Sequence, residues 1–387
     1  MQGRRGLLLL VCVGALTATA LVAIASASTA PADRRLVVGV DDDTAKWMAR
    51  PNGLLATYRD LGLGAVRVTI PWRRGISRPT RIEGLYLHRV AGLVVGGQRV
   101  VLGVYGRPVQ APRTRRERDD YCGFLAHVLE RIPIDDVVIW NEANSPTFWP
   151  AAAGAEAYEK LLATCWDRLH GLRPDVNVIS STSAHHDPSG FMRAVGDAYR
   201  TSGRTRPVVE TFGHNPYPDY AAEPPWIQHD DPATVGEGDL TRLLAAIGDG
   251  FSGTEQPLPG AGRTTVWYLE DGFQTAVPRS KRRFYSGVEN DPSVLSGPTQ
   301  AGGTARLSDQ AAQLREAVLL ASCQPAIGAF FNFELIDETR LTGWQSGLLW
   351  RDGTHKPAYE AFKDTVAQIA AGSVECDSVA GAPSTSP

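Results

Sequence analysis

Eight short apolar runs rich in β-branched residues recur along the chain, and this repetition constrains the fold more than any other feature. Stretches of helical period separate several of these runs, which is the pattern of parallel βα units. The helical stretches lie at 53–62, 118–132, 155–172 and 307–323. The expected strands are 36–40, 65–70, 99–104, 136–140, 177–181, 208–212, 265–270 and 327–333.

Eight parallel strands with helices between them can close into a barrel. We therefore predict an α/β protein with one catalytic domain, a (β/α)8 TIM barrel over residues 31–370. The chain has 387 residues, which leaves room for insertions beyond the roughly 250 of a typical barrel. The rival fold is an open doubly wound sheet, which would carry a glycine-rich phosphate loop after its first strand. Asp41, Asp42 and Asp43 stand there instead.

The N-terminal segment differs in composition from the rest of the chain. Arg4 and Arg5 precede an apolar run over 6–25, and small residues follow it. This pattern is typical of a secretory signal, which we place at residues 1–30. The alternative is an uncleaved anchor helix. In both cases the catalytic part is exported, so we expect a secreted protein, or one held at the membrane by this segment alone.

Four cysteines lie beyond that segment, an even number in a chain expected to be exported. They allow three pairings, among which the sequence does not choose. We favour Cys122 with Cys165 and Cys323 with Cys376, because each pair could join neighbouring outer segments. The spacing lacks the CxxC pairs of a zinc site, so we predict no metal. The residues after 370 are small and polar, and we expect 371–387 to form a disordered tail.

Charge excludes one class of partner. The formal net charge is -3, and the pI near 6.3 indicates no excess of basic residues. Polyanion binding needs a basic patch or stripe, so we do not expect a nucleic-acid partner. We expect a monomer that needs no cofactor.

Two glutamates stand where expected strands end. Glu142 follows the run 136–140 after Asn141, and Glu270 ends the run 265–270 before a turn signal. The carboxyl ends of barrel strands form the face on which barrel active sites are built. Glycoside hydrolysis needs two carboxyl groups flanking the scissile bond, one as a proton donor and one to attack or stabilise the anomeric carbon. The sequence places both groups at that face.

These motifs resemble a known group of enzymes. WNEAN, which contains Glu142, is similar to the strand-four motif of the clan A glycoside hydrolases, and YLED, which contains Glu270, to their strand-seven motif. The similarity is greatest to the family 39 and family 5 groups. The resemblance implies a (β/α)8 barrel, a carbohydrate substrate, retained configuration and no cofactor. It also implies that Glu142 is the general acid/base, Glu270 the nucleophile and Asn141 the donor to the sugar 2-hydroxyl.

Other segments carry the same resemblance. GAVRVTIPW is similar to the second strand of the clan, which implies that Arg67 lies near Glu270 and keeps it ionised by charge-assisted hydrogen bonds. HNPYP resembles the sixth strand, which implies that His214 lies near the acid/base and Tyr217 near the nucleophile. GLLWRDGTHKPAYEAF resembles the closing βα unit. The likeness spans about residues 36–370.

The eighth expected strand departs from the family pattern. It reads FFNFELIDE, whereas many relatives have a tryptophan here that forms the floor of the sugar-binding site. We therefore expect Phe331, Phe333 or the later Trp344 to supply that floor, with Trp344 as a substrate-binding residue. Glu334 is a competing carboxylate, but we prefer Glu270 as nucleophile because a turn signal follows it directly.

Two other functions stay open. A carbohydrate-binding barrel without turnover would keep the pocket with misplaced or blocked carboxylates. A hydrolase of another class on the same fold, such as a metal enzyme, would need a converging set of ligands. The pair His185 and His186 has no acidic partner at ligand spacing, so we interpret it as a substrate-contact or surface loop. The sequence also lacks the G-x-S-x-G elbow of serine esterases.

Overall fold

The computed structural model describes residues 35–48, 52–260, 263–288 and 309–383. The predicted signal segment, 1–30, lies outside the described residues, as do 384–387. No helix within the described ranges is long and apolar enough to cross a membrane.

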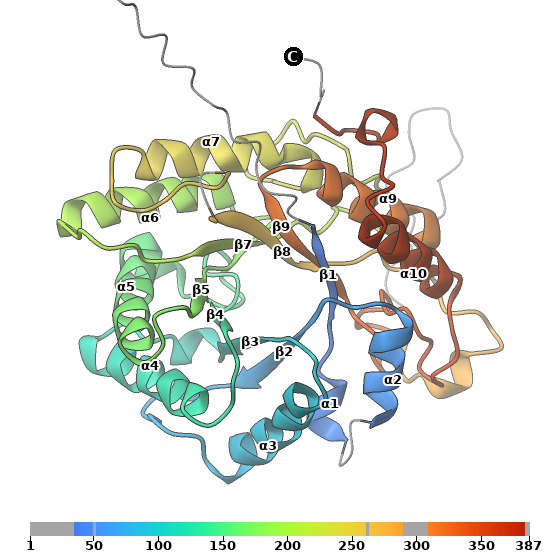
Figure 1. The fold of residues 1–387 in the computed structure, drawn as a ribbon, viewed down its shortest axis with the longest axis horizontal. Coiled ribbons are helices and arrows are strands. Elements are labelled where there is room, and N and C mark those ends of the chain that lie inside the picture. The colour runs from blue at the N-terminus through green and yellow to red at the C-terminus, as the bar shows by residue number, and fades with distance from the viewer. Residues whose placement is uncertain (1–34, 49–51, 261–262, 289–308, 384–387) are drawn as a thin grey trace, which may run out of the picture. The chain divides into compact units, whose positions relative to one another are not determined.

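The strands of the described chain form one closed parallel barrel, which confirms the predicted (β/α)8 fold. The ring closes where β1 pairs with β9, and the helices lie around it (Figure 1). The fifth barrel strand is split into β5 and β6, which both pair with β7. The strands are β1 Val37–Asp41, β2 Ala65–Pro71, β3 Val100–Tyr105, β4 Asp136–Ile139, β5 Asn177–Ile179, β6 Thr182–Ser183, β7 Thr211–Asn215, β8 Thr265–Asp271 and β9 Ile327–Phe333.

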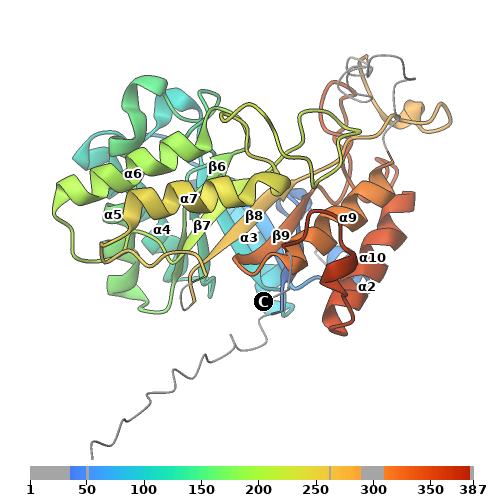
Figure 2. The ribbon, with the colours of Figure 1, turned by 90° about the horizontal axis from the view of Figure 1, so that it is seen from above.

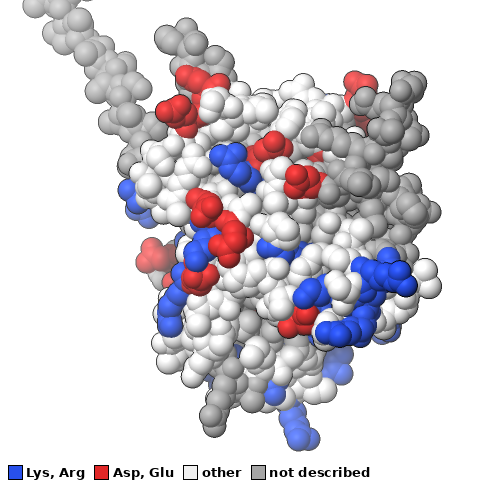
Figure 3. Space-filling view, turned by 90° about the vertical axis from the view of Figure 1, so that its right-hand side faces the viewer, with Lys and Arg blue, Asp and Glu red and all other residues white. Residues whose placement is uncertain are grey.

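Helices follow most of the strands, and α6 and α7 lie side by side along one flank (Figure 2). The α-helices are α1 Thr44–Trp47, α2 Asn52–Asp60, α3 Arg81–Val95, α4 Arg115–Leu129, α5 Gly154–Leu172, α6 Pro188–Ser202, α7 Leu240–Phe251, α9 Gln310–Cys323 and α10 Pro357–Ala370. Short 3₁₀ turns are η1 Pro108–Gln110, η2 Ala151–Ala153, η3 Glu237–Asp239, η4 Arg282–Phe284 and η5 Cys376–Ser378. Acidic and basic side chains both lie on the side that carries α10 (Figure 3).

Two apolar layers hold the barrel together. The larger layer lies between the strands and the helices. The smaller one fills the barrel interior, where Gly39 of β1 leaves room for its neighbours, since a Cβ there would lie 2.4 Å from the Ala65 carbonyl oxygen. The interior residues are Ala65, Val101, Val138, Ile179, Trp267, Leu269, Ala329 and Phe331. The barrel is therefore a packed core, and a ligand can reach only its mouth.

One expected strand is displaced. Apolar content predicted the sixth strand at 208–212, whereas β7 runs over Thr211–Asn215. The backbone amides of Val208 and Val209 donate to the side chain of Gln256 instead of joining the sheet. Gly213 occupies the interior position of β7 because a Cβ there would lie 2.1 Å from the Ser180 carbonyl oxygen. The true strand is therefore less apolar than the segment before it.

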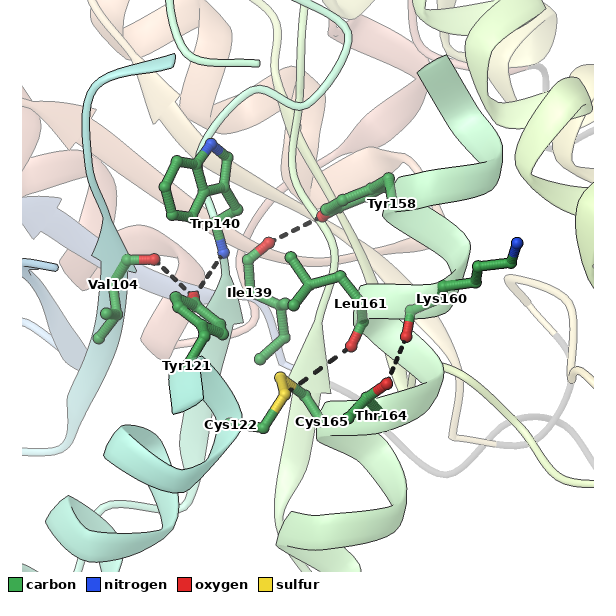
Figure 4. The surroundings of a disulfide bond; sticks show 10 residues. All are labelled: Val104, Tyr121, Cys122, Ile139, Trp140, Tyr158, Lys160, Leu161, Thr164 and Cys165. Carbon is green, nitrogen blue, oxygen red and sulfur yellow. Dashed lines mark hydrogen bonds between the residues drawn. A yellow bond between two sulfur atoms is a disulfide. The ribbon is translucent and has the colours of Figure 1, made fainter. Parts of the chain in front are cut away.

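Both favoured disulfides are present. Cys122–Cys165 joins α4 to α5 (Figure 4), and Cys323–Cys376 joins α9 to η5. The second one has Cys376 within 371–387, the segment for which a disordered tail is predicted. The described part of that segment ends at residue 383 and contains η5, because Cys376 is tied to the last residue of α9.

Candidate active site

A cleft of about 640 Å³ opens at the carboxyl ends of the barrel strands. We call it the central cleft. It contains both predicted catalytic glutamates, Glu142 after β4 and Glu270 on β8. Its other lining residues include Asp41, Asp43, Thr69, Tyr105, Asn141, Phe148, His185, His186, Tyr217, Asp219, Phe333, Glu334, Glu338 and Trp344.

Glu270 is held by two hydrogen-bond donors. Its Oε1 accepts from Arg67 Nη1 at 2.6 Å, and its Oε2 accepts from the Tyr217 hydroxyl at 3.0 Å. Arg67 is fully buried; Nη1 also pairs with Asp41, and Nη2 donates to Asn141 Oδ1 at 3.0 Å. The structure thus brings together four of the residues that the sequence placed at the site. Each carboxylate oxygen of Glu270 therefore has its own donor, one of them a guanidinium.

A bulge in β8 aims Glu270 at the cleft. The register of β8 against β9 shifts between Tyr268 and Asp271. Leu269 packs in the barrel interior, and the next residue, Glu270, lines the cleft above it. In a regular strand these neighbours would point to opposite faces, and bulges commonly re-aim a side chain next to an active site.

Glu142 has the opposite environment. Burial, followed by the nearby charge of Glu270, raises its pKa from 4.5 to about 7. A hydrogen bond of 2.9 Å from Asn215 Nδ2 to Glu142 Oε1 opposes this rise in pKa. A carboxyl with a pKa near 7 is protonated for much of the time at neutral pH and can act as a general acid. The site therefore pairs a carboxylate with a carboxylic acid.

The chain after β4 adopts an unusual backbone to present Glu142. Trp140 and Glu142 have φ values of 65° and 39°, in the left-handed region that non-glycine residues rarely adopt. Hydrogen bonds fix this turn: the Trp140 amide donates to the Tyr121 hydroxyl at 2.9 Å, as Figure 4 shows, and the Glu142 amide donates to Ser181 Oγ at 3.0 Å. Such conformations cost about 1–3 kcal/mol each and persist where their surroundings enforce them.

His214 does not reach the cleft, although the sequence placed it near the acid/base. Its ring is buried, with Nδ1 at 3.0 Å from Thr182 Oγ1 and Nε2 at 2.9 Å from the Val235 carbonyl oxygen. Burial lowers its pKa to about 4, so the ring is neutral and packs the fold. The contact to Glu142 comes from Asn215, which sequence reasoning missed. The alternation of side chains along a strand could have indicated Asn215, because residues two apart, such as Asn215 and Tyr217, lie on the same face.

Aromatic side chains form one wall of the cleft. Trp344 lies with its ring centroid 4.8 Å from that of Tyr217 and 5.6 Å from that of Phe333. Phe331, the other expected floor residue, lies in the barrel interior. Trp72 and Trp140 lie near the same end of the barrel but are completely buried, so neither offers a ring to a sugar. Trp344 and Phe333 therefore supply aromatic surface to the cleft, as do Tyr105, Phe148, Tyr217 and Tyr220 elsewhere in its lining.

The described lining of the central cleft is acidic and contains no lysine or arginine. Its seven carboxyl residues are Asp41, Asp43, Glu142, Asp219, Glu270, Glu334 and Glu338. Burial, together with the charge of Glu338, raises the pKa of Glu334 well above its usual value. Arg67 lies beneath this surface, and its Nη1 and Nη2 are held by Glu270, Asp41 and Asn141. The cleft therefore presents a negative or neutral surface to its ligand.

One group of described side chains has the geometry of a cation site. Ligand atoms of Asp219, Glu223 and His229 all lie within 4.8 Å of one another. His229 Nε2 lies 3.2 Å from Glu223 Oε1, and its Nδ1 lies 2.6 Å from Asp239 Oδ2. These hydrogen bonds, Glu223 first, raise the pKa of His229 to about 9. The imidazolium then supplies the positive charge, and we interpret the group as an ion-pair network.

Comparison with known proteins supports the fold. The sequence matches no protein-family model and no curated protein. Among solved structures, a family 39 glycoside hydrolase from Bacteroides cellulosilyticus WH2 is 18% identical with a TM-score of 0.57, over 87% of this chain and 64% of that one. The Ignisphaera aggregans GH53 catalytic domain is 16% identical with a TM-score of 0.57, over 85% of this chain and 95% of that one. GH5_18 from Streptomyces cattleya is 14% identical with a TM-score of 0.54, over 87% of this chain and 81% of that one. The chain thus shares the barrel of these glycoside hydrolases, and it spans less than two thirds of the family 39 chain.

Proposed function

We propose that this chain is an exported retaining glycoside hydrolase that cleaves O-glycosidic bonds of an oligo- or polysaccharide. The observation that carries the proposal is the contrast between two glutamates in one cleft. Glu270 accepts hydrogen bonds from Arg67 and Tyr217, which favour its charge, whereas burial raises the pKa of Glu142 to about 7. Double displacement requires one carboxylate and one carboxylic acid. The shared barrel of glycoside hydrolases supports the same reading.

In the first step a Glu270 oxygen attacks the anomeric carbon, the bond to the leaving oxygen breaks, and that oxygen takes the proton of Glu142. The glycosyl ester on Glu270 neutralises its charge, which lowers the pKa of Glu142 and suits it to act as a base. A water molecule then gives its proton to Glu142 while its oxygen displaces Glu270 from the anomeric carbon. Asn141, whose Oδ1 accepts from Arg67 Nη2, then donates its amide to the sugar 2-hydroxyl in this mechanism.

We also propose that the cleaved sugar is uncharged. A uronic-acid ring in the central cleft would set its carboxylate among Glu334, Glu338 and Glu270, with no lysine or arginine in the described lining to compensate. Like charges at about 4 Å cost roughly 1–4 kcal/mol between water and a partly buried site. We therefore expect aryl glucosides, xylosides or mannosides to exceed the matching aryl glucuronide in kcat/KM by about 100-fold.

Export is supported by the two disulfides, because such bonds persist in oxidising compartments. N-terminal sequencing of protein secreted by a bacterial host tests this part of the proposal. A mature terminus near residue 30 agrees with a cleaved signal, and an intact terminus in the membrane fraction indicates an anchor.

The test of the reaction is proton NMR of the first product from a panel of aryl α- and β-glycosides and polysaccharides. Wild type, Glu142→Gln and Glu270→Gln are compared, with Glu334→Gln as the matched control for a cleft glutamate outside the catalytic pair. Retained configuration that disappears in the Glu270 variant supports the proposal. Inverted product refutes double displacement. Loss of turnover in Glu334→Gln with activity kept in Glu270→Gln would transfer the nucleophile role to Glu334. Saccharide binding without turnover in wild type would favour a binding barrel.

A further inference from the structure

A second cavity of about 470 Å³ adjoins the central cleft beside β2 and α3. The two share Asp43, Thr69 and Tyr105 as lining residues, so they adjoin at these side chains. Volumes of both lie in the range typical of small-ligand sites, roughly 300–1,000 Å³. A chain of sugars bound in the central cleft can extend into this cavity without leaving the protein surface.

The lining of the second cavity includes an exposed tryptophan. Trp47, the last residue of α1, has 62% of its surface accessible, whereas Trp72 in the same lining is completely buried. Tyr86 of α3 meets Trp47 edge to face, with ring centroids 5.1 Å apart and an interplanar angle of 74°. Tyr86 therefore fixes the indole without covering it. A large apolar ring held in water costs hydrophobic free energy, which a ligand stacked on the ring would recover.

Polar side chains beside Trp47 suit the hydroxyl groups of a sugar. Gln110 and the guanidinium groups of Arg73 and Arg107 line the cavity. Lys46 is less available, because its ammonium group is bound to Asp43 and to the Thr69 carbonyl oxygen. An aromatic face with flanking donors is the combination that binds a pyranose, since the ring has apolar C–H faces and a polar rim.

We infer that this cavity is a distal sugar-binding subsite in which a pyranose of the bound oligosaccharide stacks on Trp47. The inference rests on the proposed glycoside hydrolase function and names its substrate class as an oligosaccharide or polysaccharide that spans both cavities. Catalytic efficiency then increases with chain length, because the distal ring adds binding energy that a short substrate lacks. Trp47 is a specificity-determining residue remote from the reacting atoms.

The experiment measures chain-length dependence in the full-length protein. Binding of cello-, xylo- and manno-oligosaccharides of two to six units to Glu270→Gln is measured by calorimetry, alone and combined with Trp47→Ala or Trp47→Phe. Val95→Ala is the matched control, because Val95 is an exposed apolar side chain outside both cavities. Turnover of aryl monoglycosides is measured in parallel with the protein that keeps Glu270.

We expect at least one series to bind more tightly as it lengthens. Trp47→Ala should reduce the ratio of long-chain to disaccharide affinity by about tenfold, Trp47→Phe should restore most of it, and Val95→Ala should leave it unchanged. A gain with length that persists in Trp47→Ala overturns the inference, as does the absence of any gain. Turnover of aryl glycosides distinguishes the two proposals. If the protein turns them over, either of these outcomes refutes only the distal subsite. If it does not, the catalytic proposal is refuted as well.

Discussion

Replacing Glu142 by glutamine should make the protein more stable, and only above a defined pH. Burial and the charge of Glu270 raise the pKa of Glu142 from 4.5 to about 7. Between these values the folded chain binds more protons at this group than the unfolded chain does. Its stability contribution is thus fully present below pH 4.5 and is lost as pH rises through about 7. At about 1.4 kcal/mol per pKa unit, the loss amounts to roughly 3 kcal/mol.

Glutamine keeps an oxygen that can accept from Asn215 Nδ2 but carries no proton to lose. The difference in free energy of unfolding between Glu142→Gln and wild type should therefore be near zero at pH 4 and reach about 3 kcal/mol at pH 8. Urea unfolding of both proteins at half-unit pH steps, with the disulfides intact, measures it. A difference that stays constant with pH, or that favours wild type at pH 8, would refute the reasoning.

Four further outcomes follow from the same contacts. The kcat/KM of the wild type should fall as pH rises through about 7, and Asn215→Ala should move this alkaline limb up by about one pH unit, because it removes a hydrogen bond to the charged form; an acid shift would contradict it. In urea unfolding, Lys356→Met should lose about 3–5 kcal/mol, because it leaves Asp337 buried and unpaired at the site of a 2.6 Å ion pair. The control Lys363→Met removes an exposed ion pair and should lose less than about 1 kcal/mol; equal losses would contradict the argument. Dialysis against EDTA should leave turnover unchanged, because the charged His229 ring supplies the cation of its network; lost turnover restored by a divalent ion would refute this.

The fold followed from local sequence signals wherever barrel strands are buried on both faces, because such strands are continuous apolar runs. The prediction failed at β7, where Gly213 and the polar residues after it replace the expected apolar run. Space inside the barrel requires a residue without a side chain there, and only the neighbouring strands reveal that requirement. Helices α3, α6 and α7 lie in stretches for which we predicted no helix.

The candidate site was predictable in its residue types and less so in its contacts. Glu142, Glu270, Arg67 and Tyr217 stand in motifs, and the barrel brings them together. His214 was predicted from resemblance, whereas strand alternation puts its side chain on the face opposite to that of Asn215. The left-handed turn that presents Glu142 depends on tertiary hydrogen bonds that its backbone amides donate to Tyr121 and Ser181, which no local pattern encodes.

The assignment of the two roles depends on how one buried cation is shared. Arg67 contacts Asp41 and Glu270, so with both carboxylates ionised its single charge would be divided between them. Burial raises the pKa of Asp41 well above its usual value, although Arg67 opposes this rise. When Asp41 is neutral, the guanidinium of Arg67 has Glu270 as its remaining charged partner. Glu270 also accepts a hydrogen bond from the Tyr217 hydroxyl. At Glu142 burial and the repulsion of Glu270 raise the pKa, and the amide of Asn215 lowers it more than the charge of Arg67 does. In the mechanism that we propose, the contact of Arg67 with Glu270 and the raised pKa of Glu142 therefore assign the nucleophile role to Glu270 and the acid role to Glu142.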